Sequence, residues 1–174
     1  MLCQHSTTIH FIITGGTIDS HYDGTKDTAV PNKESVLPNY LKSLKLTDRC
    51  IFTEVCMKDS RNLSKSDVRK VLKAIEQSKA KKIIITHGTY TMPDTAKYLQ
   101  ANLKDKNKTI ILTGSMIPLV GFSPSDAGFH LGYSISEIKN LDNGVYVCMN
   151  GQVFSPDEVV KQLKDGKFDS VFNR

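Results

Sequence analysis

The sequence has no apolar run long enough for a membrane-spanning helix. Hydrophobic residues make up 39% of its 174 residues, and no run approaches the ~20 apolar residues that a span requires. The opening segment "MLCQHSTTIH" has no basic stretch followed by an apolar core, so no secretory signal is predicted. We therefore expect a soluble cytoplasmic protein without a membrane partner.

The sequence also lacks the usual motifs for metal and nucleotide binding. Its cysteines, Cys3, Cys50, Cys56 and Cys148, form no CxxC pair and have no histidine at metal-ligand spacing, which favours free and mostly buried thiols. There is no GxGxxG and no GK[ST] motif, so nucleotide binding has little support. We expect no metal and no cofactor.

A strong basic patch is missing as well. The chain has 23 lysines and arginines against 18 acidic residues, a net charge of +5. The lysines are spread over predicted helix surfaces and loops, with few aromatic residues among them. This pattern indicates a solvated basic surface rather than a nucleic-acid interface.

What is present is an alternation of apolar, β-rich segments and helical patterns. The five predicted strands are "TIHFIITG", "RCIFTEV", "KKIIITHG", "KTIILTG" and "GVYVCMNG". Strands that are apolar almost throughout are typical of a parallel sheet covered on both faces. We therefore predict one open three-layer α/β domain over residues 1–174.

Helices are expected between and after these strands. Ser64 is predicted to cap the first, with Asp67 three residues on, and Thr91 is a plausible N-cap for another. The four predicted helical segments are "SKSDVRKVLKAIEQSKA", "TMPDTAKYLQANLKD", "SDAGFHLGYSISEIKN" and "PDEVVKQLKDG". The polar residues 20–32, which follow the first strand, are expected to form a mobile loop.

Hydroxyl side chains follow the ends of several predicted strands. Thr17 comes after the first strand in "IITGGTIDS", and Thr89 after the third in "HGTYTM". In open α/β sheets, ligands bind outside the carboxyl ends of the strands. Each turn taken alone is more often structural than catalytic, but together they place two threonines at one edge of the sheet.

Two threonines and a lysine can carry out acyl transfer without histidine or metal. A threonine hydroxyl is a poor nucleophile until a base takes its proton, and a lysine can be that base when it is partly desolvated. Lys161, after the fifth strand, can fold back toward this edge. Backbone N–H groups of the glycine turns could stabilise an oxyanion. The pattern indicates hydrolysis of an amide or ester.

Five segments together resemble the bacterial-type L-asparaginases, a family of threonine amidohydrolases. They are "TGGTI" at 14–18, "HGTYTM" at 87–92, "TGSMIP" at 113–118, "SDAGFHL" and, upstream of Lys161, "GVYVCMNGQVF". The resemblance covers essentially the whole chain. It implies the family's N-terminal domain: a three-layer αβα open sheet, mainly parallel, of flavodoxin- or Rossmann-like type.

The resemblance also implies roles for individual residues. Thr17 would be the nucleophile, with Tyr22 as its orienting partner, and Thr89 and Lys161 would form a proton relay. The segment "MKDSRNLS" looks like the family's α-carboxylate site, which points to Asp59 and Ser60. Further substrate contacts are expected from Gly16, Gly88, Tyr90 and Ser115. Lys161 and Tyr22 would be ordinary surface residues without the resemblance.

Two departures from the family pattern stand out. Tyr90 replaces the aspartate that binds the substrate's α-ammonium group, a loss on the order of 1.5 to 3 kcal/mol for one charge-assisted hydrogen bond. Full-length members also have a C-terminal domain, and a neighbouring subunit's C-terminal domain completes the substrate site. We expect this chain to have the N-terminal domain only and to act as a homo-oligomer.

These features favour hydrolysis of L-asparagine to aspartate and ammonia through an acyl-enzyme. An amidase or esterase with an altered substrate is an alternative, because of Tyr90. A non-catalytic domain that binds aspartate- or asparagine-like molecules is another, although such a domain would not need Thr17, Thr89 and Lys161 together. An amide-releasing subunit of a larger assembly is a third possibility.

Overall fold

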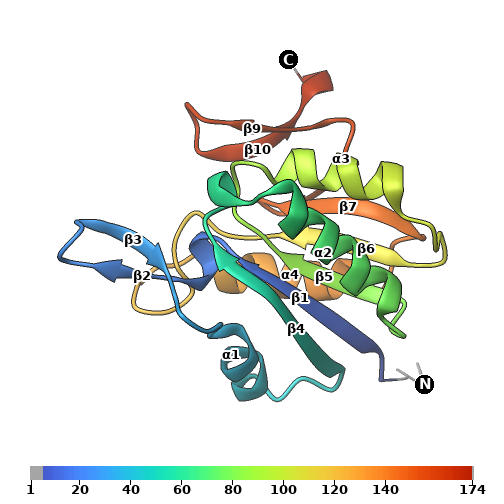
Figure 1. The fold of residues 1–174 in the computed structure, drawn as a ribbon, viewed down its shortest axis with the longest axis horizontal. Helices are drawn as coiled ribbons and strands as arrows, with labels where there is room; N and C mark the ends of the chain where they lie inside the picture. Colours follow the sequence, from blue (N-terminus) through green and yellow to red (C-terminus); the bar gives the residue numbers. More distant parts are fainter. Residues whose placement is uncertain (1–5, 174) are drawn as a thin grey trace.

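A six-stranded sheet forms the centre of the computed structural model, which describes residues 6–173. The strand order is β4-β1-β5-β6-β7-β8 (Figure 1). The bounds are β1 (Thr8–Gly15), β4 (Arg49–Lys58), β5 (Lys82–Thr86), β6 (Thr109–Thr113), β7 (Gly144–Met149) and β8 (Gln152–Phe154). All neighbours pair in parallel except β8, which is antiparallel to β7. The predicted mainly parallel sheet is confirmed.

Helices cover both faces of this sheet, as Figure 1 shows. Their bounds are α1 (Leu37–Ser43), α2 (Lys65–Gln77), α3 (Met92–Asn102) and α4 (Ala127–Glu137), with 3₁₀ turns η1 (Thr17–Asp19), η2 (Ser60–Asn62) and η3 (Val171–Asn173). Ile83 and Ile85 pack in one core with α2 and α3, whereas Ile84 packs in the other with α1 and α4. Successive side chains of a strand point to opposite faces, so the fold has the three predicted layers.

Two predicted helix starts have different outcomes. At α2, the Ser64 hydroxyl accepts from Asp67 N and the Asp67 carboxylate accepts from Ser64 N, which is the predicted capping box. At α3, Thr91 occupies the N-cap position but makes no side-chain cap. Its hydroxyl instead donates to the carbonyl of Ser60, 3.1 Å away. Thr91 therefore joins the start of α3 to η2.

The helix predicted over "PDEVVKQLKDG" is wrong. The segment contains strand β9 (Val159–Gln162), which pairs antiparallel with β10 (Lys167–Ser170). The β-branched pair Val159 and Val160 favours a strand, and Gly166 has a φ of 62° in the connecting turn. Val159 and Phe168 are both buried in the core on the α3 side. The hairpin therefore contributes one side chain from each of its strands to this core.

Residues 20–32 also differ from expectation, because they contain a regular hairpin. Strands β2 (Ser20–Asp23) and β3 (Thr28–Pro31) pair antiparallel. The hairpin is closed at its base where Asn32 N donates to the carbonyl of Asp19, 2.9 Å away. Figure 1 shows that it projects from one end of the domain.

The described residues add two further observations. Cys50, Cys56 and Cys148 are free thiols, as predicted, but only Cys148 is buried and the other two are half-buried. Cys3 lies outside the described residues. Within 6–173 every helix is too short or too polar to cross a bilayer.

Candidate functional site

The loops after β1, β4 and β5 meet in a backbone cluster of two glycines and a serine. A Cβ placed on Gly16 would lie 2.5 Å from Gly88 N, and one on Gly88 would lie 2.6 Å from Ser60 Cβ. Gly16 also has a φ of 81°, which other residues rarely adopt. Only glycine fits these positions, and the close approach brings together the backbones of the two loops that carry Thr17 and Thr89.

Lys161 and Thr89 are in direct contact. Lys161 Nζ lies 2.6 Å from Thr89 Oγ1, although 72 residues separate them in the chain. Thr89 is buried, and Lys161 on β9 is half-buried. Burial lowers the pKa of Lys161, the Arg61 charge lowers it further, and Asp59 opposes this effect. A lysine with a lowered pKa beside a threonine hydroxyl can accept a proton from it.

Thr17 and Tyr22 line a common cavity of about 370 Å³. Its other walls come mainly from residues 116–118 and 122–124. Within residues 6–173, no hydrogen bond joins the Thr17 hydroxyl to Tyr22. The Tyr22 hydroxyl instead donates to Asp27 across the β2–β3 hairpin, and this bond raises the pKa of Tyr22. The expected orienting partner is therefore near Thr17 but engaged elsewhere.

Asp59 follows the end of β4 and is the N-cap of η2, and Ser60 is the first residue of η2. The Asp59 carboxylate accepts hydrogen bonds from Arg61 Nε at 3.0 Å, Arg61 Nη2 at 2.9 Å and Arg61 N at 2.8 Å. These bonds hold the pKa of Asp59 below its usual range. Ser60 is buried against Gly88. Asp59 is thus already paired, whereas Ser60 packs its Cβ, Oγ and backbone N against Gly88.

Tyr90 lies beside two cations. Its ring centroid is 4.8 Å from the Arg61 guanidinium carbon and 4.2 Å from Lys161 Nζ, both within the range of a cation–π interaction. The side chain is half exposed. Sequence reasoning missed Arg61, and its only signal was the Asp59-x-Arg61 spacing, which suits a side chain reaching back over a 3₁₀ turn.

Two other predicted contact residues take part in structural hydrogen bonds. Gly16 N donates to the carbonyl of Lys58, 2.8 Å away, so this N–H is not available to an oxyanion. The Ser115 hydroxyl donates to the carbonyl of Ile117. Gly16 therefore contributes through close packing and Ser115 through the turn after β6.

His87 stabilises the turn that carries Thr89. It is buried, and burial lowers its pKa to about 4, so the ring is neutral near pH 7. Its Nδ1–H donates to the carbonyl of Gly88 at 2.7 Å, and its Nε2 accepts from the Thr95 hydroxyl at 3.0 Å. These bonds join the turn to α3 and give His87 a structural role.

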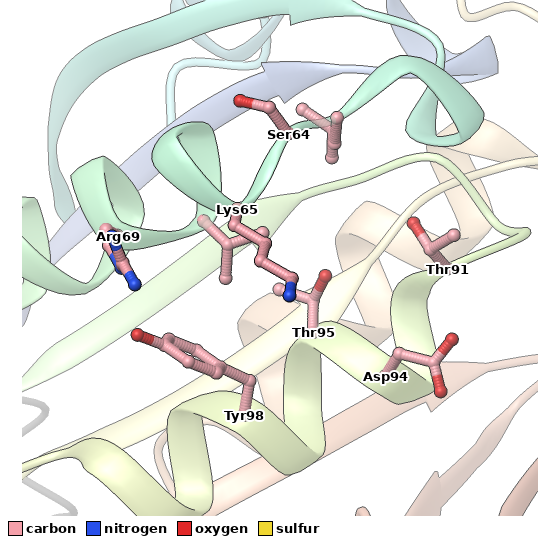
Figure 2. Close-up of a pocket in the computed structure, with 9 residues that line it drawn as sticks. Ser64, Lys65, Arg69, Thr91, Asp94, Thr95 and Tyr98 are labelled. Carbon is pink, nitrogen blue, oxygen red and sulfur yellow. The ribbon is translucent and has the colours of Figure 1, made fainter.

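A larger cavity of about 500 Å³ lies between α2 and α3. Figure 2 shows Lys65 and Arg69 of α2 facing Tyr98 of α3 across it, with Thr91 at one end. None of the predicted catalytic residues lines it. Within the part of the chain that the structure describes, no three His, Cys, Asp or Glu side chains are arranged to hold a metal.

The arrangement of threonine turns, glycine contacts and a returning lysine agrees with a family comparison. The family described as "Asparaginase, N-terminal" matches residues 8–171. The chain belongs to the asparaginase family. Among curated asparaginase-family relatives, L-asparaginase 2 of Escherichia coli K12 is 29% identical over 161 residues, which are 88% of this chain and 46% of that protein. A glutaminase-asparaginase of Acinetobacter glutaminasificans is 34% identical over 100 residues, 55% of this chain and 29% of that one.

Solved asparaginase structures share the fold. The thermostable L-asparaginase from Thermococcus kodakarensis superimposes with a TM-score of 0.80 at 22% identity, covering 95% of this chain and 51% of that one. A probable cytoplasmic L-asparaginase from Campylobacter jejuni gives 0.78 at 26% identity, with 95% and 53% covered. The chain thus spans about half the length of these asparaginases.

Proposed function

We propose that this asparaginase-family chain hydrolyses a primary side-chain amide through a threonine nucleophile, with L-asparagine as the first candidate. The observation that carries the proposal is the 2.6 Å contact between Lys161 Nζ and Thr89 Oγ1. A base with a lowered pKa is thereby held at the same backbone cluster as Thr17. A surface lysine without a catalytic role would not require this burial.

In the proposed reaction, Thr17 Oγ1 attacks the amide carbon and its proton passes to the Thr89–Lys161 pair. The C–N bond breaks, ammonia leaves with a proton, and an acyl-enzyme remains. Water then attacks the ester and releases the acid and Thr17. Tyr22 lies on the same cavity as Thr17 and is proposed to orient the hydroxyl.

Names of the relatives support an amide substrate. The Escherichia coli protein is an L-asparaginase, and the Acinetobacter protein is a glutaminase-asparaginase. Both are longer than the region that this chain matches. Their activities therefore suggest candidate substrates, and the assay should include glutamine as well as asparagine.

The deciding experiment measures ammonia release from asparagine and glutamine by the purified chain and by Thr17→Ala and Thr89→Val. We expect Thr17→Ala to lower kcat/KM about a thousandfold or more, because the nucleophile is lost. Equal inertness of all three proteins would contradict hydrolysis. Calorimetry would then test the non-catalytic alternative, since a binding domain would bind aspartate or asparagine without turnover.

Localisation and oligomeric state are also part of the proposal. We place the enzyme in the cytoplasm because the Campylobacter protein is named a probable cytoplasmic L-asparaginase, although a Haemophilus influenzae relative is named a probable periplasmic one. Small-molecule amides and further copies of this chain are the proposed partners, because Tyr22 and Tyr90 are half exposed at the site of a single copy. Sedimentation velocity that finds only monomer at all concentrations would contradict the oligomer.

A further inference from the structure

Four side chains around Thr89 determine the local charge of the site. We call Asp59, Arg61, Tyr90 and Lys161 the Tyr90 cluster. Tyr90 directly follows Thr89, and Lys161 contacts both. A substrate group that lies next to Thr89 and Tyr90 is therefore close to the charges of this cluster.

The cluster's single carboxylate, Asp59, is already paired with the Arg61 guanidinium. Asp59 accepts three hydrogen bonds from Arg61, two from the guanidinium and one from the backbone. Such a two-point contact between a carboxylate and a guanidinium is among the stronger charged hydrogen bonds. An incoming ammonium group would have to share this carboxylate with Arg61.

The aromatic ring offers no alternative partner for an ammonium group. Tyr90 already interacts with Arg61 and Lys161 at 4.8 and 4.2 Å. A third cation beside the ring would be repelled by both charges when Lys161 is protonated, and by Arg61 when it is not. A carboxylate in the same place would be attracted by them, and the Arg61 side chain is 62% exposed and can reach it.

We infer that this site selects a primary amide that carries a carboxylate but no free ammonium group, namely a monoamide of an unsubstituted dicarboxylic acid. Succinamate is the simplest member. The reaction rests on the proposed function: the C–N bond of succinamate breaks, a C–O bond from water forms, and succinate and ammonia are released. The charge selectivity can be measured separately.

The first test compares kcat/KM for ammonia release from succinamate and from asparagine. We expect the value for succinamate to be about tenfold higher, since one charge-assisted hydrogen bond lost or gained changes binding by that order. Turnover of asparagine that equals or exceeds turnover of succinamate would overturn the inference and leave amide hydrolysis intact.

The second test measures binding without turnover. Calorimetry on the Thr17→Ala variant compares succinate with aspartate, and we expect succinate to bind about tenfold more tightly. Tighter or equal binding of aspartate overturns the inference. If neither amide is cleaved but succinate is preferred, the proposed hydrolysis fails and the charge selectivity stands.

A single substitution should abolish most of the selectivity. Arg61→Ala removes one cation and frees Asp59, so the ratio of succinate to aspartate affinity should fall about tenfold. Arg69→Ala, on the exposed side of α2 and outside the cluster, is the matched control and should leave the ratio unchanged. An unchanged ratio in Arg61→Ala would show that the Tyr90 cluster does not select the substrate.

Discussion

The two halves of the candidate site are assembled to different degrees. Thr89 and Lys161 are hydrogen bonded to each other, and Thr89 is only 4% exposed. Thr17 shares a cavity with Tyr22, but the Tyr22 side chain is 53% exposed and bonded to Asp27. The proposed relay is therefore already assembled in this structure, whereas the proposed orienting role of Tyr22 would require Tyr22 to exchange Asp27 for Thr17 as its partner.

The difference follows from where each half is attached. Thr89 follows β5, a strand in the middle of the sheet, between β1 and β6. Tyr22 lies in a separate two-stranded sheet formed by β2 and β3. Elements with few buried contacts open at lower free energy than core strands. We therefore expect substitutions at Thr89 and Lys161 to be poorly tolerated, and the β2–β3 hairpin to change conformation more easily.

The largest expected effect comes from removing Lys161, the proposed relay base. Lys161→Met should lower kcat for ammonia release about 10²- to 10⁴-fold, the usual contribution of general acid–base catalysis, with thermal unfolding little changed. Lys164→Met, at an exposed position in the same hairpin, is the control. Equal activity of the two variants would mean that the preassembled half is only structural.

A smaller effect on activity is expected from a substitution at the Gly16–Gly88 contact, which joins the two halves. Gly16→Ala places a Cβ 2.5 Å from Gly88 N at a φ of 81°, and should lower the free energy of unfolding by about 1–3 kcal/mol. It should also lower activity, because Thr17 and Thr89 are pushed apart.

The control for Gly16→Ala is Gly132→Ala in α4, where an added Cβ meets nothing within 4 Å. There we expect stabilisation of about 0.5–1 kcal/mol. Urea unfolding measures both variants. A Gly16→Ala protein as stable and active as the parent would mean that the contact does not couple the halves.

The smallest effect concerns the pH dependence of the relay. Activity should rise as Lys161 loses its proton. Arg61→Ala removes a cation and frees Asp59, so it should raise the pKa of Lys161 and move the ascending limb of the kcat/KM profile to higher pH. Asp59→Asn should lower that pKa and move the limb to lower pH.

Besides these groups, Lys161 faces Tyr90 and Thr89. Tyr90→Phe keeps the ring and serves as the control, with the limb expected to stay in place. Shifts of Arg61→Ala and Asp59→Asn in the same direction would exclude Lys161 as the titrating base.

The layered architecture could be read from the sequence because its causes are local. The runs that became β1, β5 and β6 are apolar almost throughout, and the Ser64–Asp67 capping box fixes the start of α2. The threonine turns were also predictable, because parallel strands present their carboxyl ends at one edge. Their roles in catalysis remain predictions.

Other features depended on contacts that no local pattern reports. The periodicity of 156–166 fits a helix, yet Val159 and Phe168 pack together into the core as a hairpin. Burial against α3 acts here together with the β propensity of Val159 and Val160. The hairpin is also what carries Lys161 to Thr89.

Local sequence was enough to predict the five parallel strands of the central sheet, the glycine turns and the residue types at the sheet edge, because hydrophobic periodicity and backbone constraints act over a few residues. The electrostatic surroundings of Tyr90 were decided by packing. Arg61, Tyr90 and Lys161 come from three separate segments, and charge interactions depend on distance in space and on burial. The charge that this site accepts is therefore a property of the folded chain.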